Sequence, residues 1–265
     1  MPTPKNSLIL ANWKMQLNNT ESLGLFKELK EEIKGLKNTE SVEVVVCPPF
    51  TALPDIAKIA TDTKLKLGAQ DVFWEQVGAY TGEISPEMLK ECGCKYAIIG
   101  HSDRRTYLKE TDEMVHLKIK AALNCLLYPI ICVGETFKER QLGRKDYVVI
   151  RQVTQALSGI DLILDSTQLV IAYEPVWVIG SGQAIDSEEA EYMHQVIKQA
   201  LFDLYPVKIV ENCFRIIYGG SINSQIVKSF MVQPHIDGVL VGGASLNREE
   251  FVGIIKEAIK VNVFK

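Results

Sequence analysis

The chain alternates between short apolar segments and longer segments in which apolar and polar residues recur every three or four positions. The short segments are almost continuously hydrophobic and rich in β-branched residues, which is typical of strands that are covered on both faces. Eight such segments occur, and we expect strands at 7–12, 42–47, 65–70, 95–100, 128–134, 169–173, 214–220 and 236–243.

The longer segments predict amphipathic helices. In residues 20–37, for example, Leu23 and Phe26 belong to an apolar face, and Glu and Lys occupy the opposite face. At the start of another predicted helix, Asp186 and Glu189 are placed as the N-cap and N3 residues of a capping box. We expect helices at 20–37, 53–62, 86–92, 111–124, 145–158, 187–204, 223–231 and 248–260.

Strand–helix units that repeat about every thirty residues indicate a parallel sheet, and eight units are the number that closes into a (β/α)8 barrel with outer helices. The alternative is an open, doubly wound sheet, which needs a G-x-G-x-x-G turn after its first strand. Residues 8–15 contain no glycine, which disfavours that alternative. No linker or change of composition divides the chain, so we expect a single barrel domain over residues 1–265.

Composition and charge exclude several classes of protein. The chain is 47% hydrophobic and 23% charged, as expected for a globular protein with a large core. A net charge of -4 gives no basic surface for nucleic acid, and no apolar segment approaches the ~20 residues that span a bilayer. The first residues, MPTPKNSLILANWK, lack the features of a signal peptide, so we expect a cytoplasmic protein.

The six cysteines do not form a metal-binding pattern. Cys92 and Cys94 are one residue apart, and no histidine lies near them at ligand spacing. We therefore expect no metal site, and reduced thiols that are mostly buried.

In a (β/α)8 barrel the functional residues collect where the carboxyl ends of the strands meet. The segment 172–185, AYEPVWVIGSGQAI, places Glu174 at such an end, and Pro175 keeps the residue before it extended. A bulky apolar stretch with glycines at its far end follows, which is typical of a lid. A fixed carboxylate beside a lid indicates proton chemistry that is protected from water.

His101 follows another predicted strand and precedes Ser102 and Asp103, which are good helix starters. The start of a helix disfavours an imidazolium ion, so we expect a neutral ring that donates a hydrogen bond to a carbonyl oxygen. The other histidines lack such a setting, and we expect solvated positions for His116, His194 and His235.

Glycine pairs end the last two predicted strands, at Gly219-Gly220-Ser221 and Gly242-Gly243. Side by side after strands seven and eight, such turns favour a phosphate site built from backbone N–H groups. Lys14, just beyond the first strand, would stabilise both a phosphate and a developing enolate oxygen, and Asn12 would hold Lys14 in place and bind substrate. A Schiff-base role for Lys14 is the alternative, although that role favours a lysine inside an apolar strand.

A carboxylate base, a neutral histidine, a lysine and a phosphate site together indicate proton abstraction next to the carbonyl of a small phosphosugar. The motifs NWKM, YAIIGHSDRR, CVGET, AYEPVWVIGSGQA, IIYGGSIN and DGVLVGGASL, in this order from about residue 8 onwards, resemble those of the triosephosphate isomerase family. The resemblance implies a glycolytic TIM-barrel isomerase that interconverts dihydroxyacetone phosphate and D-glyceraldehyde 3-phosphate through an enediolate, without a metal or organic cofactor.

The resemblance also implies residue roles. Glu174 would be the base and His101 the electrophile, a pairing already established for this family. Asn12 and Lys14 would complete the catalytic and binding set. Phosphate binding is implied for Gly180, Ser221, Gly242 and Gly243, and supporting positions for Ser102 and Glu135.

Members of this family are usually homodimers in which the third βα loop enters the neighbouring subunit. Residues 71–85 form a long loop, and its apolar side chains near Phe73 and Trp74 favour such a contact. The resemblance places the loop tip against the partner near Met15 and Thr81 near the partner's Asn12. It also implies that Glu83 and Arg104 pair across the dimer.

The sequence departs from the family at several positions. Asp103 replaces a glutamate, which puts the network beside Lys14 in question, and Val178 and Ser181 replace Ala and Thr in the lid. We expect the lid substitutions to change opening and closing rates. Asn is more frequent at two further positions, Gln16 and Asp71. Two alternatives stay open: a phosphosugar-binding barrel with little or no turnover, supported by Asp103, and a different phosphosugar isomerase or lyase on the same fold.

Overall fold

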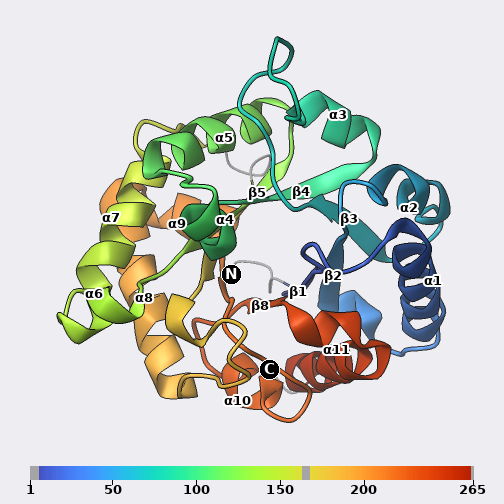
Figure 1. The fold of residues 1–265 in the computed structure, drawn as a ribbon. Helices are drawn as coiled ribbons and strands as arrows, with labels where there is room; N and C mark the ends of the chain where they lie inside the picture. The colour runs from blue at the N-terminus through green and yellow to red at the C-terminus, as the bar shows by residue number, and fades with distance from the viewer. Residues whose placement is uncertain (1–5, 163–167, 264–265) are drawn as a thin grey trace.

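Eight parallel strands form a closed barrel in the computed structural model, which describes residues 6–162 and 168–263. Neighbouring strands pair in chain order, and β1 pairs with β8 to close the ring (Figure 1). The strands are β1 (Ser7–Asn12), β2 (Val42–Cys47), β3 (Leu65–Ala69), β4 (Cys94–Ile99), β5 (Tyr128–Val133), β6 (Leu169–Tyr173), β7 (Phe214–Tyr218) and β8 (Gly238–Val241). The predicted (β/α)8 barrel is confirmed, and the open sheet is excluded because β1 and β8 are paired.

Helices surround the barrel on its outer face (Figure 1). Each predicted helical segment contains or overlaps an observed helix, whereas the sequence pattern missed α6 and α9, which are too short to display a helical period. The helices are α1 (Asn19–Lys34), α2 (Leu53–Ile59), α3 (Pro86–Glu91), α4 (Ser102–Tyr107), α5 (Asp112–Asn124), α6 (Phe137–Gln141), α7 (Lys145–Leu157), α8 (Ser187–Leu204), α9 (Val207–Cys213), α10 (Val227–Met231) and α11 (Arg248–Val263), with short 3-10 turns η1 (Thr39–Ser41), η2 (Val176–Val178) and η3 (Gly243–Leu246).

The start of α8 is only partly as predicted. Asp186 is the N-cap residue, and its carboxylate accepts the N–H of Glu188 at 2.7 Å. Glu189 does not return to the cap, because its carboxylate accepts hydrogen bonds from Arg140 and Lys145 instead. Two cationic donors outweigh one backbone N–H, so Asp186 is confirmed as the N-cap residue but the expected capping box with Glu189 is wrong.

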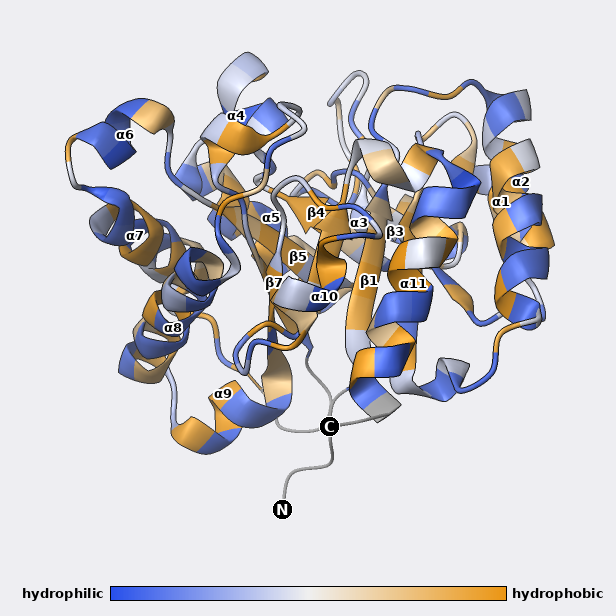
Figure 2. Ribbon diagram, turned by 90° about the horizontal axis from the view of Figure 1, so that it is seen from below, coloured by the Kyte–Doolittle hydropathy of each residue, from blue (hydrophilic) through white to orange (hydrophobic). Residues whose placement is uncertain are grey.

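Hydrophobic side chains form two layers, one inside the barrel and one between the barrel and the helices. Figure 2 shows apolar strands surrounded by helices whose outer faces are polar. The inner cluster consists of alternate strand residues, Leu8, Leu10, Val45, Cys47, Tyr96, Ile98, Ile130, Cys132, Val170, Ala172, Ile217 and Leu240. Because these side chains fill the barrel, a substrate can bind only at one of its ends.

A partly buried ionic cluster lies at the amino-terminal end of the barrel. Arg215 donates to Glu43 at 2.8 Å and to the hydroxyl of Tyr96 at 2.7 Å, and Lys66 lies 2.6 Å from Glu43. Burial alone would raise the pKa of Glu43, but Arg215, Lys66 and Tyr96 outweigh burial and lower this pKa to about 2. The cluster therefore stabilises the fold and lies far along the strands from the predicted site.

The prediction of solvated positions is wrong for His194, which is fully buried on α8 with Nδ1 2.7 Å from the carbonyl oxygen of Ala190. Burial lowers the pKa of His194 to about 4, so the ring is neutral. His116 and His235 are half-buried, and each ring bonds to a neighbouring segment, His116 to the carbonyl of Ala156 and His235 to Glu191. Helical periodicity alone did not reveal these packing partners.

Five of the six cysteines are buried, as the sequence indicated. Within residues 6–162 and 168–263, no helix combines the length and the hydropathy needed to cross a membrane.

Candidate active site

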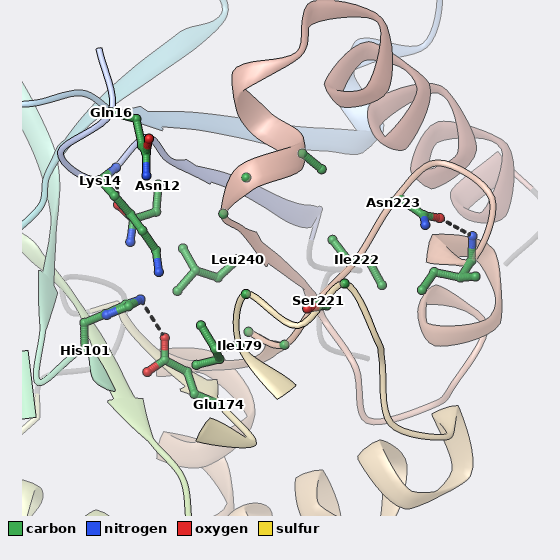
Figure 3. A pocket seen from close by; sticks show the side chains of 18 residues that line it. Asn12, Lys14, Gln16, His101, Glu174, Ile179, Ser221, Ile222, Asn223 and Leu240 are labelled. Carbon is green, nitrogen blue, oxygen red and sulfur yellow. Dashed lines mark hydrogen bonds and ion pairs between the residues drawn. The ribbon is translucent and has the colours of Figure 1, made fainter. Parts of the chain in front are cut away.

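A pocket of about 420 Å³ opens at the carboxyl ends of the strands. Figure 3 shows the side chains from β1 on one side of it, the His101 and Glu174 pair below, and the segment after β7 opposite. The pocket brings together every site residue that the sequence indicated, namely Asn12, Lys14, His101, Glu174, Gly180, Ser221, Gly242 and Gly243.

Lys14 has a strained backbone that fixes its position. Its φ of 51° lies in the left-handed region, which is costly for a residue with a side chain. Two side chains hold this conformation: Asn12 Oδ1 accepts the N–H of Lys14 at 3.1 Å, and Gln70 donates to its carbonyl at 2.9 Å. Asn12 therefore orients Lys14, as expected. Strain of this kind at a pocket wall indicates a functional constraint.

The side chain of Lys14 extends into the pocket towards the glycine turn after β8. A Cβ added to Gly242 would lie 3.7 Å from Cε of Lys14, so the lysine stem passes next to that turn. Its ammonium group lies 2.9 Å from the carboxylate of Asp103. The shorter side chain of Asp103 thus reaches Lys14, and the concern raised by this substitution is not supported by the geometry.

His101 is the N-cap residue of α4. Its Nδ1 accepts the N–H of Asp103 at 3.0 Å, so Nδ1 carries no proton and the hydrogen of the neutral ring is on Nε2. Nε2 lies 3.0 Å from Oε1 of Glu174 and faces the pocket. The local backbone thus holds the histidine in the tautomer that donates a hydrogen bond into the site.

Glu174 follows β6 and is only 2% exposed. Its Oε2 accepts the N–H of Ser102 at 2.9 Å, and its own N–H donates to the carbonyl of Val133 at 2.8 Å. Oε1 has no well-aligned hydrogen bond among the described residues, although Nε2 of His101 is close. One carboxylate oxygen is therefore anchored, and the other is left to accept a proton.

Gly134 allows the backbone of Glu174 to pass unusually close. A Cβ at position 134 would lie 1.7 Å from the carbonyl oxygen of Glu174. Gln152 fixes Gly134 by accepting its N–H at 2.7 Å and donating to its carbonyl at 3.2 Å. The sequence analysis missed Gln152, because nothing in a helical pattern marks a buried amide that reaches a neighbouring strand end.

Ser221 and the glycine turns form the opposite end of the pocket. The Ser221 hydroxyl donates to the carbonyl of Val178 at 2.9 Å, which links the segment after β7 to the lid. Gly242 precedes the 3-10 turn η3, whose first residue is Gly243. Backbone N–H groups at the start of such a turn are free of helical partners and suit an anionic group.

The lid begins with η2 and ends near Asp186. Gly180 and Gly182 have φ values of 74° and 75°, a conformation that glycine adopts without strain. Val178 is buried, and the Ser181 hydroxyl donates to its carbonyl at 2.8 Å. Val178 therefore lies at the packed base of the lid and Ser181 on its exposed part, and the effect of both substitutions on the rates of the lid stays a prediction.

Glu135 is a buried anchor under the lid. Its carboxylate accepts the hydroxyl of Tyr173 at 3.0 Å and the indole N–H of Trp177 at 3.1 Å, and it is fully buried. This contact agrees with a supporting position. Tyr173 was not singled out in the sequence, since a tyrosine at the end of an apolar strand looks like core.

A second buried ionic network lies behind His101. Asp71 accepts from Lys118 at 2.7 Å and lies 2.8 Å from Arg104. Glu110 accepts from both cations and also from the N–H of Gly100 at 2.9 Å, directly before His101. Burial raises the pKa of Asp71 to about 6, even though Lys118 and Arg104 act to lower it.

Known proteins resemble this chain over nearly its whole length. A family model described as triosephosphate isomerase matches residues 7–258. Among relatives, the triosephosphate isomerase of Dictyoglomus thermophilum is 46% identical over 252 residues, 95% of this chain and 99% of that protein. The protein of the same name from Carboxydothermus hydrogenoformans is 44% identical over 96% of this chain and 100% of its own length.

A solved structure is also similar. The triosephosphate isomerase of Bartonella henselae superposes with a TM-score of 0.84 at 32% identity, covering 96% of this chain and 99% of the other. The family model covers residues 7–258, a range that contains all eight strands. The chain therefore belongs to the triosephosphate isomerase family.

Proposed function

We propose that the pocket interconverts dihydroxyacetone phosphate and D-glyceraldehyde 3-phosphate, the intramolecular aldose–ketose isomerisation of its family, with Glu174 as the base. The observation that carries this proposal is the arrangement of Glu174 and His101, with Oε1 and Nε2 side by side 3.0 Å apart. The free oxygen of Glu174 would take a proton from one carbon of the triose and return it to the adjacent carbon. The anchored Oε2 keeps the carboxylate in place during this transfer.

His101 and Lys14 would stabilise the enediolate that forms between the two proton transfers. The Nε2–H of His101 would donate to the oxygen that gains negative charge, and the ammonium group of Lys14 would supply a positive charge nearby. The strained backbone of Lys14 supports this role, because strain maintained by Asn12 and Gln70 keeps the cation in position before substrate arrives.

The phosphate group would bind between Ser221, Gly180 and the Gly242–Gly243 turn. Closing the lid over it would exclude water, which otherwise promotes loss of phosphate from an enediolate. The proposed steps use only protein side chains and backbone groups, so they require no cofactor or metal.

The experiment compares wild-type protein with Glu174→Gln in a coupled assay for glyceraldehyde 3-phosphate conversion. Removal of the base should lower kcat by about a hundredfold or more, with little change in KM. Glu188→Gln, an exposed carboxylate in the first turn of α8, is the matched control and should retain full activity. No turnover by folded wild-type protein contradicts the function, and near-normal turnover by Glu174→Gln contradicts the assignment of the base.

The alternative of a phosphosugar-binding barrel without turnover depended on Asp103. The carboxylate of Asp103 lies 2.9 Å from the Lys14 ammonium, so the shorter side chain still makes this ion pair. The substitution therefore no longer favours a barrel without turnover. A different isomerase or lyase on the same fold is disfavoured by the family match over residues 7–258.

We further propose a homodimer in which residues 71–85 of one subunit enter a groove of the other. The groove beside Met15 has a volume of about 570 Å³ and an apolar wall that includes Leu17 and Phe50. Met15 itself is 96% exposed, and Val77 at the loop tip is 88% exposed. Exposed apolar residues on both a loop and a groove favour mutual burial of the two.

The loop differs in one respect from expectation. Phe73 is buried and stacks on Trp74 at 4.1 Å, so these rings shape the loop base. The contact with the partner would then be made by the exposed Val77 and Tyr80. Arg104 pairs within its own chain, with Asp71 and Glu110, so its expected pairing with Glu83 across the dimer would come in addition to these contacts.

Sedimentation equilibrium at micromolar concentration tests the dimer. Wild-type protein should sediment as a dimer, and Val77→Glu should shift it towards monomer because a charge at the tip would lose its hydration. Val207→Glu, at an exposed valine of α9, is the control and should leave the dimer intact. A wild-type monomer contradicts the proposal.

We also propose that the whole chain is one domain located in the cytoplasm. The barrel runs from β1 to β8, and α11 packs against α1, so no described part of it is independent. Free thiols at Cys47, Cys92, Cys94, Cys125 and Cys132 are compatible with a reducing compartment.

A further inference from the structure

A buried serine, Ser245, holds the glycine turn that follows β8. Its N–H donates to the carbonyl of Gly242 at 2.8 Å, and its hydroxyl donates to the same oxygen at 2.6 Å. Ser245 is 0% exposed and lies behind the turn, whereas Gly242 and Gly243 line the pocket. The serine can therefore act on a ligand in the pocket only through the backbone of the turn.

The carbonyl that Ser245 holds belongs to the peptide unit that joins Gly242 to Gly243. This unit is trans, so its C=O and its N–H lie in one plane and point in opposite directions. Holding the carbonyl of Gly242 on the buried side therefore directs the N–H of Gly243 to the pocket side. Neither glycine has a Cβ that would restrict rotation of this unit, so its orientation depends on the bonds from Ser245.

The same two bonds improve the N–H of Gly243 as a donor. A carbonyl that accepts hydrogen bonds polarises its amide, and the N–H of that amide then donates a stronger hydrogen bond. Gly243 is the first residue of η3, so its N–H has no partner within the turn. An anion at this turn would meet an oriented donor, with the stem of Lys14 close to Gly242.

We infer that Ser245 is a positioning residue of the phosphate site, whose hydroxyl fixes the Gly242–Gly243 peptide so that the N–H of Gly243 donates to the phosphate. The inference rests on the proposed function, because it concerns the place where the phosphate of the triose would bind. The phosphate does not react, so its contacts are the same before and during the proton transfers. Loss of the hydroxyl should therefore weaken binding of the substrate and of the transition state equally.

The test compares wild-type protein with Ser245→Ala in two measurements, the Kd of inorganic phosphate by calorimetric titration, and kcat and KM for glyceraldehyde 3-phosphate. Loss of one hydroxyl hydrogen bond should raise Kd and KM about fivefold and leave kcat nearly unchanged. Ser245→Cys has a similar shape and a weaker donor, so its Kd should lie between those of wild-type protein and Ser245→Ala.

Ser41→Ala is the matched control. Ser41 ends the 3-10 turn η1 before β2, at the amino-terminal end of the barrel. Its N–H and its hydroxyl donate to the carbonyl of Asn38 at 3.2 Å and 2.8 Å, which is the same pair of bonds that Ser245 makes. Ser41→Ala therefore removes an equivalent hydrogen bond far from the pocket, and it should leave both Kd and KM unchanged.

Three results would overturn the inference. The first is an unchanged Kd in Ser245→Ala, and the second is an equal rise of Kd in Ser41→Ala. The third is a kcat that falls as far as kcat/KM in Ser245→Ala, because a merely structural role would disturb the proton transfers as well as the phosphate. If wild-type protein neither turns over substrate nor binds inorganic phosphate, the proposed function itself fails, which the wild-type measurements alone reveal.

Discussion

Asp71→Asn provides a direct measurement of the cost of burying a carboxylate at the base of the loop 71–85. Asp71 is 5% exposed and contacts Lys118 and Arg104, yet burial, together with the negative charge of Glu110, outweighs both cations and raises its pKa to about 6. Asn is nearly the same size and cannot ionise. The comparison of the two proteins therefore isolates the titration of one group.

The magnitude follows from linkage. With a pKa of about 6 in the folded protein and 3.8 as the reference value, the folded state binds the proton more tightly than the unfolded chain. The stability of wild-type protein relative to Asp71→Asn is therefore highest at low pH and falls as pH rises through the window from about 4 to 6. One pKa unit corresponds to 1.36 kcal/mol, so the full change is about 3 kcal/mol, of which about 1.4 kcal/mol falls between pH 5 and pH 8.

The assay is urea unfolding of both proteins at pH 5, 6, 7 and 8, at one protomer concentration, because an oligomer's stability depends on concentration. The expected result is a difference in the free energy of unfolding that moves steadily in favour of Asp71→Asn with rising pH. A flat difference, or one that moves in favour of wild-type protein, would refute the reasoning. Such a result would mean that Lys118 and Arg104 lower the pKa of Asp71 by at least as much as its surroundings raise it.

Two further changes test other parts of the barrel. Gly134→Ala places a Cβ 1.7 Å from the Glu174 carbonyl oxygen, so we expect a loss of more than about 3 kcal/mol in the free energy of unfolding and a fall in kcat. Gly24→Ala, in a helix with nothing within 4 Å, is the control and should stabilise by about 0.5–1 kcal/mol; equal effects in urea titrations would contradict the close approach. Glu43→Gln removes a carboxylate whose pKa is lowered to about 2, so its contribution is present above pH 4.5 and is lost as pH falls. The advantage of wild-type protein over Glu43→Gln should shrink by about 2 kcal/mol between pH 6 and pH 3, and an advantage that does not change over this range would disprove the ionic role.

The eight strands and the rim residues could be predicted from the sequence because their signals are local. Apolar β-branched segments such as 169–173 predict a buried strand. Glu174 and the glycine turns directly follow such segments. In a parallel barrel all carboxyl ends meet at one rim, so chain position alone groups these residues. The short helices α6 and α9 carry too few residues for this kind of signal.

Partners far apart in the sequence could not be predicted in the same way. His194 occupies a helix position that also suits the surface, and only the packing of α8 against the barrel explains its burial. Glu189 fits a capping box by spacing, but cations from another segment compete for it. The ion pair of Asp103 with Lys14 joins the first turn of α4 to the segment after β1, and no local pattern of residue types encodes such a contact.

The pairing of β1 with β8 has a consequence for synthesis of the chain. More than two hundred residues separate the two strands. At a ribosomal rate of about 5–20 residues per second, the backbone groups on one edge of β1 remain unpaired for roughly ten to forty seconds, until β8 has been synthesised. Through that interval the nascent sheet has an open, apolar edge that can pair with another chain. We therefore expect a chaperone that covers β1 during synthesis to raise the yield of closed barrels.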